Sequence, residues 1–317
     1  MYPRPDIGTG SGVSGYDIVN RQRILITGAS GFIGRHLLHL LAAQNAELHA
    51  VQLSGCPATG AEVHWHQIDL LQSDAAAALI ALIEPTHLVH LAWYAEPGKY
   101  WTSPLNLRWL EATTRLVEAF CLGGGTRMVM AGTCAEYDWN CGYCREETTP
   151  LRPATLYGVA KDATRRLVMA LSAQYQVPCA WGRVFIPYGE GEAPQRLIPS
   201  LCSIFRDEKE PFPVNATGYR DFMHVSDVAS GLLALLNTDS VGIYNISSGH
   251  PVQIAMLVRT VAELLNKDPQ PLLALALERP EEPPLLVGDN RKLKALGWEP
   301  RLSLTEGLMQ NIGHRIL

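Results

Sequence analysis

The sequence predicts an α/β fold in which a doubly wound, mostly parallel sheet carries a smaller α/β domain towards its C-terminus. Three observations predict it. Short β-rich runs alternate with helical patterns from residue 23 to 185, a glycine-rich turn joins the first run to the first helix, and prolines become frequent from Pro187 onward. Such alternation places helices on both faces of a parallel sheet. The prolines indicate a more irregular domain over the carboxyl edge of that sheet, where open α/β sheets bind ligands.

We expect strands where β-rich apolar runs are short, and helices where apolar residues recur every three or four positions. The predicted strands are Arg23–Thr27, Glu47–Leu53, Val63–Ile68, His87–Leu91, Arg127–Ala131 and Cys179–Phe185. The predicted helices are Phe32–Gln44, an Ala-rich segment before His87, Pro104–Cys121 and Leu156–Gln174. Residues 1–20 are expected to form a disordered leader. Residues 21–187, with part of 221–250, are expected to form the sheet domain, and 188–317 mainly a substrate domain.

Composition excludes several classes of protein. Of the 317 residues, 47% are hydrophobic and 18% charged, as in an ordinary soluble protein. A net charge of −5 gives no basic surface, so nucleic acid is not an expected partner. No apolar run reaches the ~18 residues that span a bilayer, and no signal-peptide pattern opens the chain, so we expect a cytoplasmic protein without a membrane partner. Seven cysteines argue against a disulfide framework. Cys141 and Cys144 lack the second ligand pair of a zinc site, so no metal is expected.

The segment Thr27–Gly34 reads TGASGFIG and joins the first strand to the first helix. Glycines in such a turn let a pyrophosphate approach the helix N-terminus, where free N–H groups and the helix dipole favour anions. The glycine spacing departs from G-x-G-x-x-G because Ala29 stands where the first glycine of that pattern would be, and the glycines are Gly28, Gly31 and Gly34. We expect a dinucleotide here, and a glycine-rich turn without a ligand is the alternative. The predicted contacts are Gly28, Ser30, Gly31, Phe32, Ile33 and Gly34.

Tyr157 and Lys161 are four residues apart in a predicted helix and therefore lie on one face of it. A phenol titrates near ~10 and is a poor acid or base at neutral pH. A neighbouring ammonium stabilises the phenolate and draws the pKa of the phenol toward the working range. The pair is a candidate proton donor for hydride transfer.

Together these motifs resemble the extended short-chain dehydrogenase/reductase family, whose members mostly act on nucleotide-diphosphate sugars. The resemblance rests on TGASGFIG, the HLA of 90–92, the YxxxK of 157–161, RDFMHVSD at 220–227 and LGWEP at 296–300. It extends from about Arg23 to Pro300. It implies a Rossmann sheet, an NAD(P) cofactor, a nucleotide-diphosphate sugar as substrate, and a homodimer formed through the helices 104–121 and 156–174.

The resemblance also implies roles for individual residues. Thr133 would complete the catalytic set with Tyr157 and Lys161, and Lys161 would also bind the nicotinamide ribose. The other implied cofactor contacts are Asp69 and Leu70 at the adenine, with Leu91 and Ala92 after the fourth strand. The implied substrate contacts are Gln195, Arg196, Arg220 and Arg279, the last two at the diphosphate. The alternatives are a capping role for Asp69 and ordinary surface positions for the arginines. The aromatic cluster of Trp93, Tyr94, Tyr100 and Trp101 could wall the sugar pocket or belong to core or lid packing.

Two departures from the family pattern refine the expectation. Sugar 4,6-dehydratases of the family carry Asp-Glu directly after the threonine, whereas this chain has Cys134-Ala135. Glu136 would face the other way on a strand, so dehydration is disfavoured. Gln52 stands where an NAD-specific enzyme usually presents a carboxylate to the ribose 2′-hydroxyl. Its neutral side chain favours NADP(H) over NAD(H).

We therefore expect an enzyme that reduces a 4-keto sugar of a nucleotide diphosphate, in deoxysugar or cell-surface polysaccharide biosynthesis. Tyr157 would donate the proton while Thr133 orients the carbonyl. A 4-epimerase that retains NAD uses the same three residues and stays open as an alternative. A non-catalytic dinucleotide-binding regulator is the second alternative, and the intact catalytic set argues against it.

Overall fold

The computed structural model describes residues 22–53 and 63–313. The predicted leader at 1–20 lies outside these ranges. Within them, no helix combines the length and the apolar character needed to cross a membrane.

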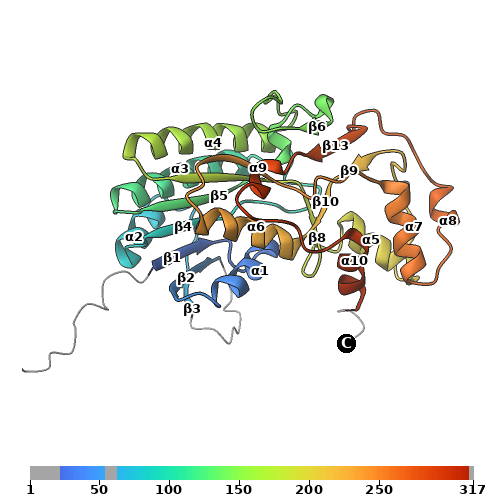
Figure 1. Cartoon of the computed structure of the whole chain (residues 1–317), viewed down its shortest axis with the longest axis horizontal. Helices are drawn as coiled ribbons and strands as arrows, with labels where there is room; N and C mark the ends of the chain where they lie inside the picture. The colour runs from blue at the N-terminus through green and yellow to red at the C-terminus, as the bar shows by residue number, and fades with distance from the viewer. Residues whose placement is uncertain (1–21, 54–62, 314–317) are drawn as a thin grey trace, which may run out of the picture.

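A seven-stranded parallel sheet forms the centre of the larger domain (Figure 1). Its strand order is β11-β7-β5-β4-β1-β2-β3. Its strands are β1 (Gln22–Thr27), β2 (Ala46–Gln52), β3 (Val63–Gln67), β4 (His87–His90), β5 (Arg127–Thr133), β7 (Cys179–Val184) and β11 (Gly242–Ile246). The order reverses between β1 and β4, so the carboxyl ends of these two strands flank a crevice of the kind that binds ligands in doubly wound sheets. The predicted α/β fold with a mostly parallel sheet is confirmed.

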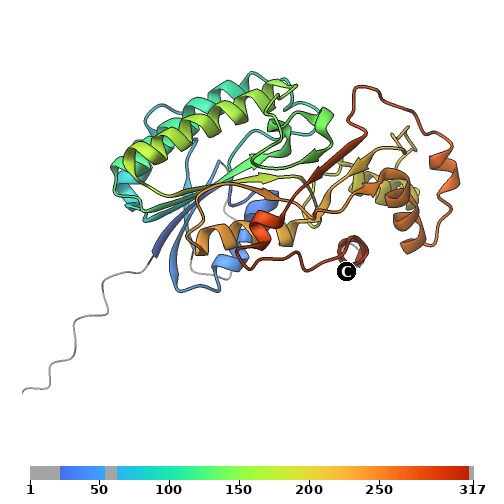
Figure 2. The same ribbon diagram turned by 45° about the horizontal axis from the view of Figure 1, so that its top comes forward.

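Helices cover both faces of this sheet, as Figures 1 and 2 show. One face carries α1 (Phe32–Leu41) and α6 (Val225–Asn237), and the other carries α2 (Ala75–Ile83), α3 (Leu105–Leu122) and α4 (Leu156–Tyr175). Successive side chains of a strand point to opposite faces. Accordingly, Ile24 and Ile26 of β1 join the core under α1 and α6, while Leu25 joins the core under α2 and α3.

A smaller domain continues from the carboxyl end of β7, because β8 (Ile186–Tyr188) begins two residues after that strand ends. Its own apolar core joins side chains of α5 (Leu197–Phe205), α7 (Ile254–Leu264), α8 (Gln270–Leu273) and α10 (Leu304–Gly313). β8 pairs with β10 (Phe222–His224). A further sheet has the order β12 (Val252–Gln253), β9 (Tyr219–Arg220), β13 (Leu285–Gly288) and β6 (Tyr143–Cys144), and α9 (Arg291–Lys294) follows it. The chain returns to the main sheet for α6 and β11 between these elements.

The structure differs from the sequence-based expectation at the end of β5. That strand continues to Thr133, and residues Cys134–Glu136 then form a single 3₁₀ turn, η1, followed by a second turn, η2 (Trp139–Cys141). Glu136 therefore does not lie on a strand, and the alternation argument used for its direction is wrong. Its direction is set instead by hydrogen bonds inside the turn, because Thr133 and Glu136 cap it reciprocally.

Candidate active site

The glycine loop after β1 is shaped for close contact between backbone segments. A Cβ on Gly34 would lie 2.1 Å from the carbonyl oxygen of Gly28, so only glycine lets α1 start this close to β1. Gly31 is the N-cap of α1 and has no side chain to occupy the free N–H groups of the first turn. These donors suit a diphosphate. Leu91 and Ala92 lie beside the loop, because their N–H groups donate to the carbonyl and the hydroxyl of Thr27 at 3.1 and 3.4 Å.

The edge of the sheet at β2 and β3 offers polar groups suited to an adenosine. Gln52 ends β2 and is buried, and its Oε1 has no hydrogen-bond partner among the described residues. A ribose hydroxyl could satisfy this acceptor. Asp69 accepts from the N–H of Leu71 at 3.0 Å and forms a local turn rather than a helix cap, since α2 begins only at Ala75. Leu70 next to it is buried.

The predicted catalytic residues come from two elements that pack tightly. Thr133 ends β5, and Tyr157 lies in the first turn of α4, whose N-cap Thr155 accepts from the N–H of Gly158 at 3.1 Å. A Cβ on Gly158 would stand 2.3 Å from the carbonyl oxygen of Ala135, so glycine is what allows α4 to approach η1. This approach brings Tyr157 beside Thr133. The expectation that Lys161 lowers the pKa of the Tyr157 phenol is wrong: burial is the largest effect and raises that pKa, while the neighbouring Thr133 hydroxyl acts in the opposite direction.

Lys161 lies one turn further along α4 and is buried. Its Nζ donates to the carbonyl oxygen of Ala131 at 2.9 Å and lies 4.0 Å from the centre of the Trp93 ring. Burial lowers the pKa of Lys161 from 10.5 to about 7, and Glu136 opposes this shift. The ammonium and the neutral amine of Lys161 are therefore close in free energy at neutral pH.

Aromatic side chains enclose Tyr157. Its ring makes edge-to-face contacts with Trp93, Tyr100 and Trp101, with ring centres 4.8 to 6.5 Å apart. Three members of the predicted aromatic cluster thus meet at the phenol. The fourth member, Tyr94, does not belong to this group of rings around Tyr157. Its hydroxyl instead donates to Glu96 at 2.8 Å.

Asn106 of α3 holds this aromatic wall in place. Its Oδ1 accepts from the indole of Trp93 at 2.8 Å, and its Nδ2 donates to the carbonyl of Tyr100 at 2.7 Å. Sequence reasoning missed this residue. The signal is a fully buried amide on a helix whose buried side chains are mostly apolar, and burial becomes visible only in the folded chain.

The four predicted substrate residues divide into two groups. Arg196 is the N-cap of α5 and lies against the hydroxyl of Tyr100, where it counteracts the rise that burial causes in the pKa of this phenol. Gln195 before it is exposed. Arg220 of β9 and Arg279 meet on one carboxylate, because Glu282 accepts from Arg220 at 3.0 Å and from Arg279 at 3.1 Å. Sequence reasoning paired the two arginines but missed Glu282.

Fold and site together define an α/β dinucleotide-binding enzyme with a Thr–Tyr–Lys set. The chain belongs to the NAD dependent epimerase/dehydratase family, whose model matches residues 24–247. The resemblance to the extended short-chain dehydrogenase/reductase family is thereby confirmed, as is its implication of an NAD-dependent enzyme family that acts on nucleotide sugars.

Individual relatives show how broad this family is. The UDP-glucose 4-epimerase of Thermus thermophilus, solved with NAD, is 25% identical, with a TM-score of 0.79 over 92% of this chain and 98% of that one. MoeE5, solved with UDP-glucose and NAD, is 30% identical, with a TM-score of 0.80 over 93% and 98%. A trifunctional UDP-glucose 4,6-dehydratase/UDP-4-keto-6-deoxy-D-glucose 3,5-epimerase/UDP-4-keto-L-rhamnose-reductase of Arabidopsis thaliana is 24% identical over 92% of this chain. The chain spans only 46% of the length of that plant enzyme.

Proposed function

We propose that the protein is an NAD(P)-dependent reductase of a 4-keto sugar carried on a nucleoside diphosphate. The proposal rests chiefly on one observation: a half-buried Tyr157 stands beside Thr133 and Lys161, and its surroundings raise the pKa of its phenol. A phenol that holds its proton suits a proton donor, which reduction of a ketone requires.

Each residue of the set has a distinct task in this proposal. The hydroxyl of Thr133 donates to the keto oxygen and fixes it near the phenol. Tyr157 transfers its proton to that oxygen as the carbonyl is reduced, and the ammonium of Lys161 stabilises the phenolate that remains. The nicotinamide supplies the hydride when it is bound. The aromatic wall of Trp93, Tyr100 and Trp101 limits the access of water to the phenol.

The turn after Thr133 supports reduction over dehydration. A 4,6-dehydratase needs an acid and a base directly after the threonine, and Cys134 and Ala135 supply neither. The nearest carboxylate, Glu136, is fully buried in an ion pair with Arg183 at 2.7 Å. It is therefore not free to take up a proton from a sugar.

The substrate side of the proposal rests on Arg220 and Arg279. Two guanidiniums that already converge on one carboxylate can converge on a diphosphate, since both ligands present paired oxygens. MoeE5 binds UDP-glucose, and we propose a nucleotide sugar of the same chemical class for this chain. We also propose a cytoplasmic location, where such substrates and cofactors are present.

A homodimer through α3 and α4 is part of the proposal. The two helices pack side by side (Figure 1) and expose apolar side chains that a partner would cover. These are Leu107 and Leu122 on α3 and Val159 and Leu167 on α4. Light scattering coupled to gel filtration tests it: a monomer that stays monomeric at high concentration contradicts the dimer.

Turnover tests the function directly. The protein is supplied with a UDP-4-keto-6-deoxy sugar and with NADPH or NADH, and the reduced cofactor should be consumed in proportion to the alcohol formed. Tyr157→Phe should abolish turnover while dinucleotide binding persists. The competing 4-epimerase would instead interconvert UDP-glucose and UDP-galactose with no added cofactor. That result, without consumption of reduced cofactor, would overturn the proposal.

A further inference from the structure

We propose that Glu136 is a positioning residue of the active site, which holds Thr133 through its backbone and keeps the Tyr157–Lys161 pair protonated through its negative charge. Glu136 is fully buried and therefore acts through these residues rather than on the substrate. The inference rests on the proposed function, which assigns the proton transfer to Tyr157.

One carboxylate oxygen of Glu136 fixes the catalytic turn. Its Oε1 accepts from the N–H of Thr133 at 2.9 Å and from the indole N–H of Trp181 at 3.0 Å. The hydroxyl oxygen of Thr133 in turn accepts from the N–H of Ala135 at 3.2 Å. This reciprocal capping fixes the backbone of Thr133 and one lone pair of its hydroxyl, and it leaves the hydroxyl proton free to point at Tyr157 or a substrate oxygen.

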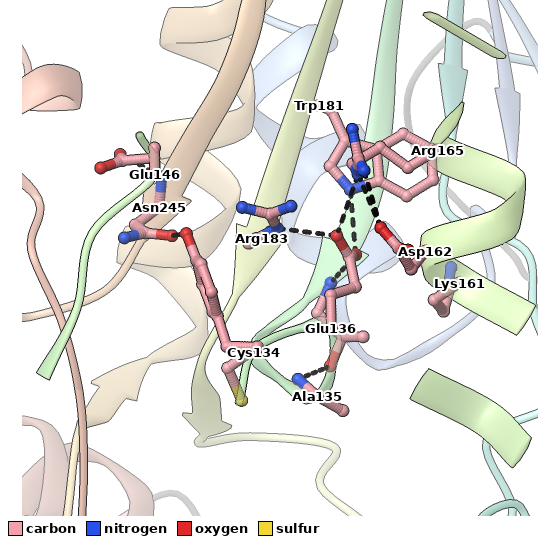
Figure 3. Close-up of polar contacts among 12 residues, drawn as sticks. Cys134, Ala135, Glu136, Glu146, Lys161, Asp162, Arg165, Trp181, Arg183 and Asn245 are labelled. Carbon is pink, nitrogen blue, oxygen red and sulfur yellow. Dashed lines mark hydrogen bonds and ion pairs between the residues drawn. The ribbon is translucent and has the colours of Figure 1, made fainter. Parts of the chain in front are cut away.

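The other oxygen ties the turn to two neighbouring elements (Figure 3). Oε2 accepts from Nε of Arg183 on β7 at 2.7 Å and lies 3.8 Å from Nε of Arg165 on α4. Arg165 also pairs with Asp162 at 2.7 Å, and Asp162 directly follows Lys161. Glu136 thus links the strand-end turn that carries Thr133 to the helix that carries Tyr157 and Lys161.

The charge of Glu136 acts on both members of the acid–base pair. It opposes the fall in the pKa of Lys161 that burial causes, and it adds to the rise in the pKa of Tyr157. Both effects have the same direction, because a nearby negative charge favours the more protonated form of any group. If Glu136 had only a structural role, its charge would change neither the pKa of Lys161 nor that of Tyr157.

The other charged groups around the network do not change this direction. Arg183 is almost fully buried and lies over the ring of Tyr137, on the far side of Glu136 from Lys161 in Figure 3. Asp162 pairs with Arg165 at 2.7 Å and with Arg166 at 2.9 Å, so it offsets part of the positive charge of these two arginines. His90 of β4 is uncharged at working pH, because burial and Lys161 lower its pKa to about 3. Burial also raises the pKa of Cys134, which keeps this thiol neutral.

Glu136→Gln separates charge from positioning. The amide oxygen can still accept from Thr133 and Trp181, but the negative charge is lost. We expect the pH profile of kcat to move to lower pH, whichever limb is measured, because the pKa values of Lys161 and Tyr157 both fall. The matched control is Tyr137→Phe in the next position, which removes a 2.7 Å hydrogen bond to Asn245 without changing any charge. Its profile should coincide with that of the parent protein.

Loss of the buried carboxylate leaves the guanidinium of Arg183 without its partner, and Glu136→Gln alone can fail to fold for that reason. The double variant Glu136→Gln/Arg183→Met removes both charges and is expected to fold, since both partners of a buried pair can be replaced by groups of similar size. It should retain a smaller shift to lower pH, because loss of the Arg183 guanidinium, which lies on the far side of Glu136 from Lys161, offsets part of the effect.

A second readout needs no turnover. Ionisation of Tyr157 is measured as the ultraviolet difference between each protein and its own Tyr157→Phe version, and in the Glu136→Gln background it should occur at lower pH. This readout distinguishes failure of the inference from failure of the proposed function, because it reports on the phenol even in a protein without reductase activity. A folded Glu136→Gln variant with unchanged Tyr157 ionisation would show that the charge of Glu136 has no effect on the phenol and that Glu136 serves the structure alone.

Discussion

The ammonium nitrogen of Lys161 lies 4.0 Å from the centre of the Trp93 ring, so the ring face is one of the few groups that solvate this buried charge. Attraction between a cation and an aromatic face contributes ~0.5–2 kcal/mol, most where water is excluded. Trp93 therefore does more than wall the pocket. It shifts the balance between ammonium and amine in a group whose pKa lies near 7.

Replacing Trp93 with leucine should move the basic limb of the kcat/KM profile to lower pH, because kcat/KM reports the groups of the free enzyme and Lys161 would lose its proton sooner. The profile is measured with saturating cofactor and limiting keto sugar. Trp101→Leu is the control, since Trp101 contacts Tyr157 but not the ammonium of Lys161. If the basic limb of the kcat/KM profile shifts equally in both variants, the cause is the loss of a large aromatic side chain and not the loss of the contact with the ammonium.

The buried ammonium of Lys161 should also reduce the stability of the fold. Its pKa is about 7 in the folded protein and near its ordinary value of 10.5 in the unfolded chain. Between these two pH values the unfolded chain binds more protons at this group, so its contribution to stability rises with pH. Below pH 7 the full penalty applies.

We expect Lys161→Met to be inactive and more stable than the parent by about 2 kcal/mol at pH 7. The difference should shrink as the pH rises toward 10. Urea unfolding of both proteins across this range measures it. A variant that is less stable at pH 7 would show that the bond from Lys161 to Ala131 outweighs the cost of burying the charge.

The close approach of α1 to β1 predicts the effect of a single methyl group. Gly34→Ala would place a Cβ 2.1 Å from the carbonyl oxygen of Gly28, so the loop must open. We expect loss of dinucleotide binding, measured by calorimetry, and a loss of stability of about 1–3 kcal/mol. Gly313→Ala in α10 adds the same methyl group where no atom lies within 4 Å and should change neither quantity.

The neutral side chain at the end of β2 predicts relaxed cofactor use. Gln52 has a buried acceptor that a 2′-hydroxyl can satisfy, and it carries no charge that repels a 2′-phosphate. Gln52→Glu should lower kcat/KM for NADPH by about tenfold or more through like-charge repulsion, and that for NADH much less. Gln44→Glu, before the opposite end of β2, is the control. An equal loss with both cofactors would mean that residue 52 does not face the ribose.

The sequence predicts those features that depend on local pattern. The alternation of apolar runs identifies the main strands, and the spacing of Tyr157 and Lys161 places both on one helix face, where the structure has them. The two-residue strands β6, β9 and β12 escape such reasoning, because pairing with a distant strand defines them. The same holds for Glu136. Its partner Arg183 is 47 residues away, and no pattern near residue 136 indicates that a carboxylate there meets a guanidinium.

The shared carboxylate of Glu282 gives the two arginines different expected roles. Arg220 is buried and also donates to the carbonyl of Pro283 at 2.7 Å, so it supports the strand pairing of β9 as well as any ligand. Arg279 is partly exposed, and its other bond reaches the carbonyl of Pro213 at the surface. Removing a charge-assisted hydrogen bond to a bound phosphate costs about 1.5–3 kcal/mol, or roughly 10–150-fold in affinity.

Arg279→Gln should therefore raise the KM for the nucleotide sugar by such a factor with little change in Tm. Arg220→Gln should raise KM similarly and also lower Tm, because backbone acceptors lose their donor. Steady-state kinetics and thermal unfolding of both variants test this, with Arg259→Gln on the exposed side of α7 as the control. If both variants keep the parent KM while Arg220→Gln loses stability, the arginines serve the fold, and the diphosphate is bound elsewhere.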